Sequence, residues 1–257
     1  MKSYKGIRQT HCDKSFVFNG FGCGCNSHLH ILRSYEACHM AGKKSGEILD
    51  ICGFSYKIES RPLNWWSGKG DWMRVIAGKA KGRKLVTRES DATRPTADRM
   101  KEALFSSIQF SIAGSRFLDI FAGSGAIGIE ALSRGAAYAA FIESEEEALS
   151  CIRQNLKALD FQNQAELIGR DVYSALRELS ARGETFDIVF LDPPYRQGHE
   201  TRCLDAIRDF SLLAETGFAV VESASETEIA VDGMICVKEK RYRTTKFSFF
   251  ELAEGGE

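Results

Sequence analysis

The 257-residue sequence lacks a long hydrophobic run, an excess of charge of either sign, and any internal repeat or low-complexity tract. No apolar run approaches the roughly 20 residues that a membrane-spanning helix needs, and the basic residues 1–10 are not followed by the apolar stretch of a signal peptide. We therefore expect a soluble, cytoplasmic protein whose eight cysteines are reduced thiols. The formal net charge of −1 argues against a polycationic coat for nucleic acid.

The first 72 residues differ from the rest, because they hold five of the eight cysteines and four of the five histidines and show no sustained period. A zinc module could use Cys23, Cys25, His28, His30, Cys38 and His39, but Cys-x-Cys is tighter than the usual zinc spacing. We expect instead an extension that is disordered or translated from a misassigned start, with Met73 as the natural first residue. No metal site is predicted.

Strands and helices alternate after Met73. Two short strands at residues 74–77 and 84–86 flank a turn rich in Gly and Lys, and a helix runs from Thr96 to about residue 110. Strands are then predicted at residues 116–121, 138–142, 165–168, 186–191, 217–222, 235–238 and 246–252, and helices at residues 126–133, 145–159, 172–181 and 200–210. This order predicts an α/β fold with a mostly parallel sheet and an antiparallel C-terminal hairpin.

A glycine-rich loop, AGSGAIG at residues 122–128, follows the strand at residues 116–121. It contains G-x-G-x-x-G, and Glu143 lies eighteen residues after Gly125, at the end of the next strand. Glycines permit a tight strand-to-helix turn and a close approach of a ligand to the backbone. A dinucleotide-binding site would show the same two features, so the glycine pattern alone leaves the ligand open.

Asp119, near the end of that strand, favours a different ligand. A carboxylate there would repel a pyrophosphate but could bind a cationic amino-acid head group. S-adenosylmethionine has an ammonium and a ribose but no phosphate. Glu143 would accept hydrogen bonds from the ribose, and Asp171 from the adenine amine, unless Asp171 only caps the next helix. The predicted cofactor-binding residues are Asp119, Phe121, Gly123, Ser124, Gly125, Glu143, Asp171 and Val172.

A tetrad, Asp192-Pro193-Pro194-Tyr195, follows the apolar strand at residues 186–191. Because proline lacks the N–H that a sheet needs, the chain must leave the sheet at Asp192, where open α/β sheets bind their ligands. A carboxylate, a rigid backbone and an aromatic ring together suit a planar group that carries an NH2. We predict Asp192, Pro193, Pro194 and Tyr195 as the catalytic residues.

Basic residues are concentrated at the two ends of the region after Met73. Such clusters are typical of contacts to nucleic-acid phosphates, although ordinary solvated lysines give the same pattern. Arg99 could instead pair with Glu102. The predicted RNA-binding residues are Lys79, Lys81, Arg83, Lys84, Arg94, Thr96, Arg99, Lys240, Arg241 and Tyr242.

The glycine loop and the tetrad together resemble class I methyltransferases that act on exocyclic amines of nucleobases. More narrowly, MRVIAGKAKGRKL at residues 73–85, RPTADR at residues 94–99 and Leu104-Phe105 are similar to the opening of the RsmD family. The resemblance covers residues 73–252. It implies a Rossmann-like, class I S-adenosylmethionine-dependent methyltransferase fold, with an RNA-binding hairpin and helix at residues 73–110 and the methyltransferase domain at residues 111–257.

The resemblance also implies an activity, the transfer of a methyl group from S-adenosylmethionine to N2 of a guanine in 16S ribosomal RNA. The partner would be that RNA or the assembling small ribosomal subunit. Independently of the resemblance, a monomer is the default expectation, and the sequence leaves the oligomeric state open. Asp192 and the Pro193 carbonyl would orient the amine, and Tyr195 would stack on the flipped base. Alternatives are a DNA or RNA adenine-N6 methyltransferase, an NAD(P)-binding oxidoreductase, and an RNA-binding module with a vestigial cofactor loop.

Two further positions can be compared with the family pattern. The family commonly has a second acid two residues after the position of Glu143, and Glu145 stands there. A glycine expected after Tyr242 is replaced by Arg243. This difference bears on contacts to RNA and leaves the residues assigned to the chemistry unchanged.

Overall fold

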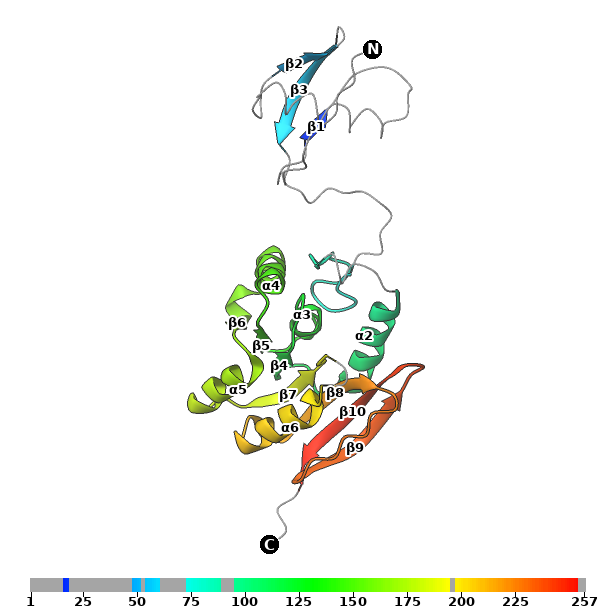
Figure 1. Ribbon diagram of the computed structural model, residues 1–257, viewed down its shortest axis with the longest axis vertical. Helices are drawn as coiled ribbons and strands as arrows, with labels where there is room; N and C mark the ends of the chain where they lie inside the picture. The colour runs from blue at the N-terminus through cyan, green and yellow to red at the C-terminus, as the bar shows by residue number, and fades with distance from the viewer. Residues whose placement is uncertain are drawn as a thin grey trace, which may run out of the picture. The chain divides into compact units, whose positions relative to one another are not determined.

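The protein is described by a computed structural model that covers residues 16–18, 48–51, 54–60, 73–88, 95–194 and 197–253. The chain divides into two units, residues 1–69 and residues 70–257. In the first unit, β1 (Phe16–Phe18), β3 (Phe54–Ser60) and β2 (Ile48–Ile51) form an antiparallel sheet in that order (Figure 1). The sequence pattern did not predict these strands. The six residues of the zinc alternative lie outside the described residues.

The second unit is built on a seven-stranded sheet of order β6-β5-β4-β7-β8-β10-β9. Parallel pairing joins β4 (Arg116–Ile120), β5 (Tyr138–Glu143), β6 (Ala165–Gly169), β7 (Phe186–Leu191) and β8 (Leu213–Ala224). Antiparallel pairing adds β10 (Thr245–Leu252) and β9 (Met234–Arg241). The predicted mostly parallel sheet with an antiparallel C-terminal hairpin is therefore confirmed.

The helices described in this unit pack on both faces of the sheet (Figure 1): α2 (Pro95–Ile108), α3 (Ala126–Ser133), α4 (Glu146–Leu159), α5 (Val172–Ala181) and α6 (His199–Asp209). A short 3-10 helix, η2 (Gln162–Gln164), precedes β6. Neighbouring strand residues point to opposite faces, so Phe117 packs in one core with α2, α3 and α4, and Leu118 in another with α5 and α6. None of the described helices is long and apolar enough to cross a membrane.

Two strands are longer than the sequence predicts. β8 begins at Leu213 instead of residue 217, and β9 continues to Arg241 instead of residue 238. Both extensions are paired, because Leu213 lies opposite Phe186 of β7 and Arg241 lies opposite Lys246 of β10. Pairing with a neighbouring strand is not visible in a local pattern, which explains the shorter predictions.

The two short strands predicted at residues 74–77 and 84–86 do not form: residues 73–88 make a compact hairpin-like turn that carries one isolated bridge, between Arg74 and Lys84. This segment is called the hairpin below. Its turn approaches α3 so closely that the Lys79 N–H donates to the Ser133 carbonyl at 2.8 Å. Gly78 has φ +82°, and a Cβ at Gly78 would lie 1.8 Å from the same carbonyl oxygen. Only glycine therefore fits at this contact.

A buried carboxylate of α3 fixes the hairpin to the rest of the unit. Glu130, which is 0 % exposed, accepts hydrogen bonds from the backbone N–H groups of Ile76 (2.7 Å) and Ala77 (2.9 Å). Its charge is balanced by Arg134 at 2.8 Å and by Lys101 of α2 at 3.6 Å. The hairpin, α2 and α3 thus meet at Glu130, whose buried carboxylate is both ion-paired and hydrogen-bonded.

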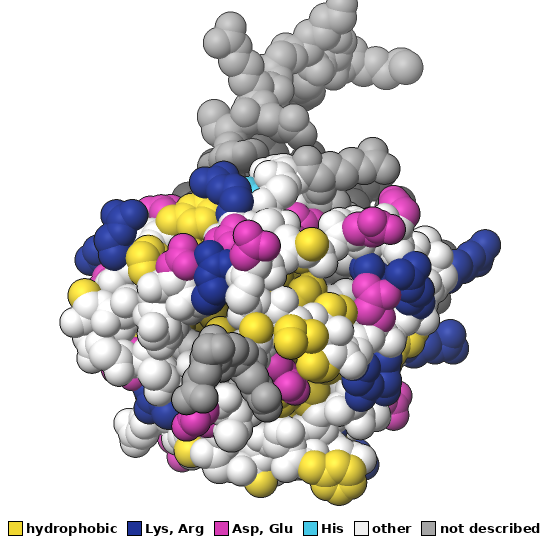
Figure 2. Space-filling model, turned by 90° about the horizontal axis from the view of Figure 1, so that it is seen from below, with side chains coloured by type: hydrophobic (Ala, Val, Ile, Leu, Met, Phe, Trp, Pro, Cys, Tyr) yellow, Lys and Arg dark blue, Asp and Glu magenta, His cyan; other side chains and the backbone are white. Residues whose placement is uncertain are grey.

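The surface of this unit carries charges of both signs. On the face that Figure 2 shows, Lys and Arg side chains lie among Asp and Glu side chains, and hydrophobic side chains gather near the centre. The described side chains of this face therefore present a mixed surface and not a single basic patch.

Candidate active site

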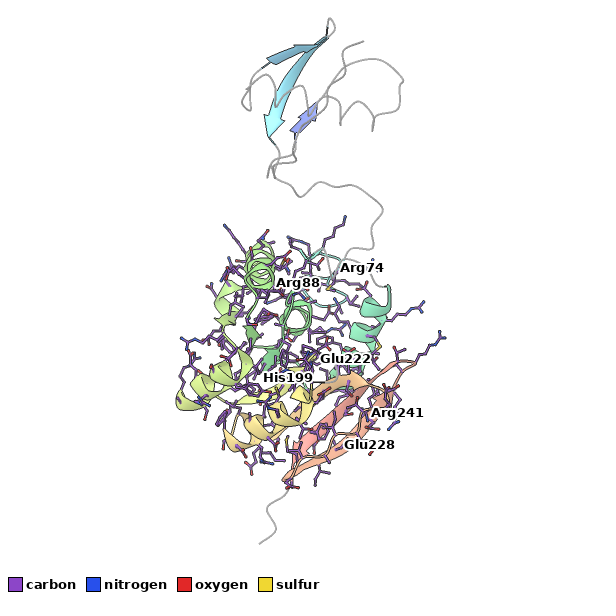
Figure 3. The ribbon with its side chains drawn as sticks, viewed as in Figure 1. Arg74, Arg88, His199, Glu222, Glu228 and Arg241 are labelled. Carbon is purple, nitrogen blue, oxygen red and sulfur yellow. The ribbon has the colours of Figure 1, made fainter. Side chains whose placement is uncertain are left out.

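A pocket of about 1070 Å³ opens at the carboxyl ends of β4, β5, β7 and β8, beneath the hairpin and α2. The sheet order runs from β4 to β5 and β6 on one side and to β7 and β8 on the other, so the pocket lies where the order reverses. Open α/β sheets bind ligands at such a switch point. Figure 3 gives the position of Glu222 within the unit, with Arg88 above it on the hairpin side.

The glycine loop forms the wall of the pocket between β4 and α3. Gly125 has φ +75° and is the residue from which α3 starts, a conformation that favours glycine. A Cβ at Gly128 would lie 2.3 Å from the Phe141 ring, so glycine also lets α3 pack on β5. Phe121, the residue after β4, adopts φ +62°, an uncommon conformation for a bulky residue, and lines the pocket.

Asp119 of β4 is 1 % exposed and lines the pocket from below the glycine loop. The Gly128 N–H donates to its Oδ2 at 2.8 Å. Among the described residues, no second hydrogen bond is made by this carboxyl, so Oδ1 remains an acceptor for a ligand. Burial raises the pKa of Asp119 to about 8, and the Gly128 N–H opposes that shift.

Glu143, at the end of β5, holds the loop in place. Its Oε2 accepts from the Gly123 N–H at 2.8 Å, and its Oε1 accepts from the N–H groups of Ser144 (2.7 Å) and Glu145 (2.9 Å). Each carboxylate oxygen can accept more than one hydrogen bond, so these contacts leave capacity for a ribose. Glu145, the second acid, forms an ion pair with Arg88 of the hairpin.

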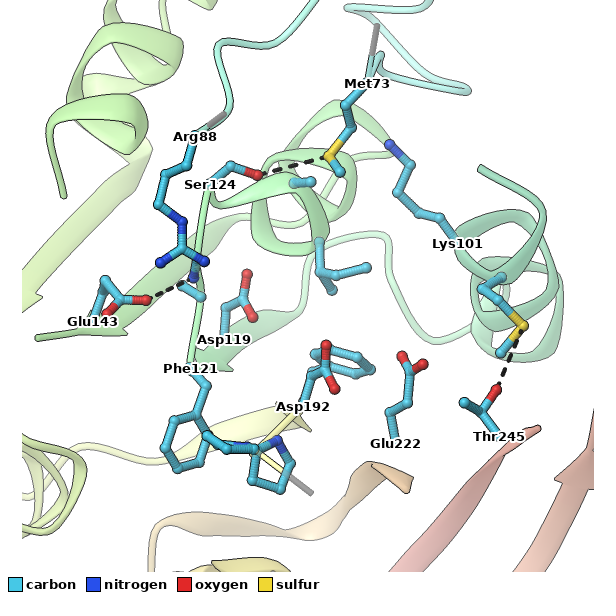
Figure 4. Close-up of a pocket in the computed structure, with 18 of the residues that line it drawn as sticks. Met73, Arg88, Lys101, Asp119, Phe121, Ser124, Glu143, Asp192, Glu222 and Thr245 are labelled. Carbon is cyan, nitrogen blue, oxygen red and sulfur yellow. Dashed lines mark hydrogen bonds between the residues drawn. The ribbon is translucent and has the colours of Figure 1, made fainter. Parts of the chain in front are cut away.

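The tetrad leaves the sheet at the predicted place. Asp192 follows β7 directly and lines the pocket with Pro193 and Pro194 (Figure 4). The Asp192 side chain is exposed to the open pocket, yet the surrounding protein raises its pKa to about 6. Water in the pocket moderates that shift. Tyr195 lies outside the described residues.

Glu222 of β8 is the main pocket residue that the sequence analysis missed. Figure 4 shows its carboxyl beside that of Asp192. Burial, with the Asp192 charge as a second cause, raises the pKa of Glu222 to about 8. Its signal was available, because the predicted strand at residues 217–222 ends on this acid, much as Asp192 directly follows the strand before the tetrad.

Five of the eight predicted cofactor residues line the pocket: Asp119, Phe121, Gly123, Ser124 and Glu143. Gly125 lies in the same loop, at the start of α3, but is not one of the lining residues. Asp171 and Val172 do not line it. Asp171 is exposed and caps α5, accepting from the Ser174 N–H at 3.0 Å, and this hydrogen bond lowers its pKa. Val172 packs in the core beneath α5.

The predicted RNA-binding residues are spread over two surfaces. On the hairpin, Lys79 donates to Gln164 (2.7 Å) and Arg83 to the Ala158 carbonyl (2.8 Å), while Lys81 and Lys84 are exposed. Arg99 is exposed on α2; Arg94 and the Thr96 side chain lie outside the described residues. On β9 and after it, Lys240 is half-buried, Arg241 pairs with Glu239 (2.8 Å), and Tyr242 packs on Phe247.

No group of three or more His, Cys, Asp or Glu side chains within the described ranges is placed to hold a metal ion. The remaining pocket walls come from Met73, whose sulfur accepts from the Ser124 hydroxyl at 3.7 Å, and from Lys101 and Thr245. Burial lowers the pKa of Lys101, whose ammonium donates to the Arg74 carbonyl at 2.5 Å.

A sheet of this order, with a glycine loop after its first strand and acids at the ends of the first two strands, defines a class I, Rossmann-like methyltransferase fold. A solved structure described as "Putative methyltransferase yhhF from Escherichia coli" has this fold. It matches with a TM-score of 0.61 and 32 % identity, over 70 % of this chain and 98 % of that one.

A family model described as "Conserved hypothetical protein 95" matches residues 73–251, and the chain belongs to this family. The relative named "Putative rRNA methyltransferase YlbH", from Bacillus subtilis, is 36 % identical over 70 % of this chain and 98 % of its own length. "Ribosomal RNA small subunit methyltransferase D" of Escherichia coli K12 is 39 % identical over 62 % of this chain and 78 % of its own length. The predicted resemblance to the RsmD family is confirmed.

Proposed function

We propose that the protein transfers a methyl group from S-adenosylmethionine to the exocyclic N2 of a guanine in 16S ribosomal RNA. The observation that carries the proposal is that Asp192 and the two prolines face the same pocket as the glycine loop, Asp119 and Glu143. One pocket therefore offers acceptors for an amine and a cradle for a methyl donor. The named rRNA methyltransferases among the relatives support RNA as the substrate.

The residues of the pocket fit S-adenosylmethionine. The open Oδ1 of Asp119 suits an ammonium, and the Glu143 carboxylate, already oriented by three backbone N–H groups, suits ribose hydroxyls. A pyrophosphate would meet a buried acid at Asp119, which disfavours the oxidoreductase alternative. When bound, the sulfonium supplies an electrophilic methyl group.

Asp192 and the Pro193 carbonyl orient the guanine amine. The N2 lone pair is delocalised into the base, and acceptors on both N–H bonds favour a tetrahedral nitrogen with that lone pair directed at the methyl group. The proline pair restricts the backbone that carries these acceptors. Catalysis is then mainly orientation together with stabilisation of positive charge on the amine. Asp192 accepts the surplus proton after transfer.

The partner in this proposal is 16S ribosomal RNA or the assembling small subunit, and the protein works as a monomer in the cytoplasm. The exposed Lys81 and Lys84 of the hairpin contact RNA phosphates, which gives binding a marked dependence on salt. An adenine-N6 methyltransferase, the alternative function, would use the same tetrad but would bind adenine in place of guanine.

The test offers labelled S-adenosylmethionine to small ribosomal subunits, naked 16S RNA and DNA. We expect N2-methylguanosine in RNA, and Asp192→Ala to lower the rate at least about 100-fold, a loss typical of removing one group that stabilises the reacting centre. Asp232→Ala, at an exposed acid outside the pocket, is the matched control. Label on DNA alone, or an Asp192→Ala rate equal to that of the control, would contradict the proposal.

A further inference from the structure

We propose that Glu222 binds the N1–H of the target base and so selects guanine over other bases that present an amine. The inference rests on the proposed function and assigns base selection to a residue outside the tetrad. Three observations carry it: the register that puts Glu222 beside Asp192, the lack of a hydrogen-bond partner for its carboxyl among the described residues, and the donor pattern of guanine.

The register of the sheet fixes the two acids next to each other. Phe190 of β7 lies opposite Val220 of β8, and Leu191 lies opposite Val221. Asp192 and Glu222 are the next residues of two parallel neighbouring strands, and both line the pocket. Glu222 shares a sheet face with Val220, which packs in the core under α2 and α3, so its side chain points to the hairpin side (Figure 4).

Two other acids of the pocket already accept hydrogen bonds from the protein backbone. Asp119 holds the Gly128 N–H, and Glu143 holds three backbone N–H groups of the loops around it. Glu222 accepts no hydrogen bond from any residue in the described part of the chain. A half-buried carboxyl in such a place gains most from a ligand that donates to it.

Besides Glu222, the charged groups that line the pocket are Asp98 and Lys101 of α2, Asp119, Glu143, Asp192, and the ion-paired Arg88 and Glu145. From β10 come Thr245 and Phe247, of which Phe247 lies opposite Glu222 in register. The ammonium of the neighbouring Lys246 pairs with Glu239. Acids therefore outnumber bases around Glu222, which favours a ligand edge rich in donors.

Guanine presents such an edge. Beside its N2 amine, which Asp192 holds, lies the N1–H donor, and beyond that the O6 acceptor. An ionised Glu222 accepts from N1–H. A neutral Glu222 accepts from N1–H through its carbonyl and donates its O–H to O6. In adenine the atom next to the reactive amine is N1, an acceptor, which an ionised carboxylate repels.

The test compares Glu222→Ala and Glu222→Gln with the control Glu228→Gln, an exposed acid in the loop after β8 (Figure 3). The substrate is a small subunit rebuilt on ligated 16S RNA, with either guanine or 2-aminopurine at the nucleotide that the wild-type protein methylates. 2-Aminopurine keeps the N2 amine but lacks N1–H. The measured quantity is the ratio of kcat/KM for the two bases, so a difference in intrinsic amine reactivity cancels between variants.

We expect the wild type and Glu228→Gln to prefer guanine by at least about 100-fold, since a site built to accept a hydrogen bond rejects an analogue without the donor. Glu222→Ala should reduce this preference at least tenfold. Glu222→Gln should still methylate guanine, because its amide carbonyl can accept from N1–H. Since the amide does not titrate, the preference of this variant for guanine over 2-aminopurine should not change with pH. In the wild type the preference should rise between pH 7 and 9, as Glu222 ionises and can no longer donate to N1 of 2-aminopurine.

An unchanged preference in Glu222→Ala would overturn the inference and leave the proposed function standing. If that variant fails to fold, a Glu222→Gln preference that rises with pH as in the wild type overturns it equally. A wild-type protein that forms no N2-methylguanosine would instead refute the proposed function.

Discussion

The acids of the pocket differ in what holds each carboxyl, and that difference decides what each can do. Asp119 keeps one oxygen for a ligand, and Glu143 orients the glycine loop. Asp192 is exposed beside Glu222, whose carboxyl accepts no hydrogen bond from the part of the chain that the structure describes. The raised pKa values of Asp119 and Glu222, about 8 each, mean that these two carboxyl groups are mostly protonated at neutral pH. A cationic ligand would displace the proton of Asp119.

Replacing Asp119 by Asn tests its role in cofactor binding. The amide oxygen of Asn can still accept from the Gly128 N–H, so the loop should keep its shape, while the charge that binds the ammonium is lost. A hydrogen bond to a charged group is worth about 1.5–3 kcal/mol, so affinity for S-adenosylmethionine should fall at least about tenfold. Titration calorimetry measures this, with Asp232→Asn as the control. Equal affinities for S-adenosylmethionine in the two variants would show that Asp119 does not bind this cofactor.

The elements of the unit are joined to one another by a few buried polar side chains. Glu130 connects the hairpin to α2 and α3, and Asn155 of α4 connects it to the glycine loop. Asn155 accepts from the Val86 N–H at 2.7 Å and donates to the carbonyls of Val86 (2.9 Å) and Ser124 (3.1 Å). The hairpin that carries the basic residues is thus fixed to the loop that shapes the cofactor pocket.

Glu130→Ala should release the hairpin. The change leaves Lys101 without its acid partner and the Ile76 and Ala77 N–H groups without their acceptor. Breaking a buried ion pair in this way costs about 3–5 kcal/mol of unfolding free energy. Hydrogen exchange should accelerate at the two amides and stay unchanged in β4. Glu102→Ala, an exposed acid of α2, is the control. Exchange in Glu130→Ala that is no faster than in the control would show that packing alone holds the hairpin.

Most elements, and much of the site, could be predicted from the sequence because their signals are local. Glycine spacing and the proline pair mark the loop and the tetrad, and apolar runs mark β4 and β7. Arg88 was missed because its role depends on an ion pair with Glu145, which is distant in the chain. The acid at the end of the predicted strand 217–222 was a local signal for Glu222, but its place beside Asp192 depends on the register of β7 and β8. Asp171 was assigned to the adenine from its place after a strand, a place that equally makes it the cap of α5.

At the scale of the whole molecule, stability should depend on pH through acids shifted in opposite directions. Folding raises the pKa values of Asp119 and Asp192 from 3.8 to about 8 and about 6, and that of Glu222 from 4.5 to about 8. The ion pairs of Glu239 with Lys246 and Arg241 lower its pKa from 4.5 to about 2. The three acids with raised pKa values stabilise the folded state at acid pH. Glu239, with its lowered pKa, stabilises the folded state at pH values above the usual carboxyl pKa.

Between pH 5 and 8 the folded protein therefore binds more protons than the unfolded chain, so its unfolding free energy should fall as pH rises. The slope is about 1.4 kcal/mol per pH unit for each extra proton bound. Below pH 4 stability should fall again, as Glu239 loses its ion pairs. Asp119→Asn removes one titrating group, so urea unfolding at pH 5.5, 7 and 8.5 should give a shallower decline than in the wild type. A wild-type stability that rises over this interval would show that the pocket acids are ionised in the folded protein. An equal decline in Asp119→Asn would show that Asp119 itself does not contribute to it.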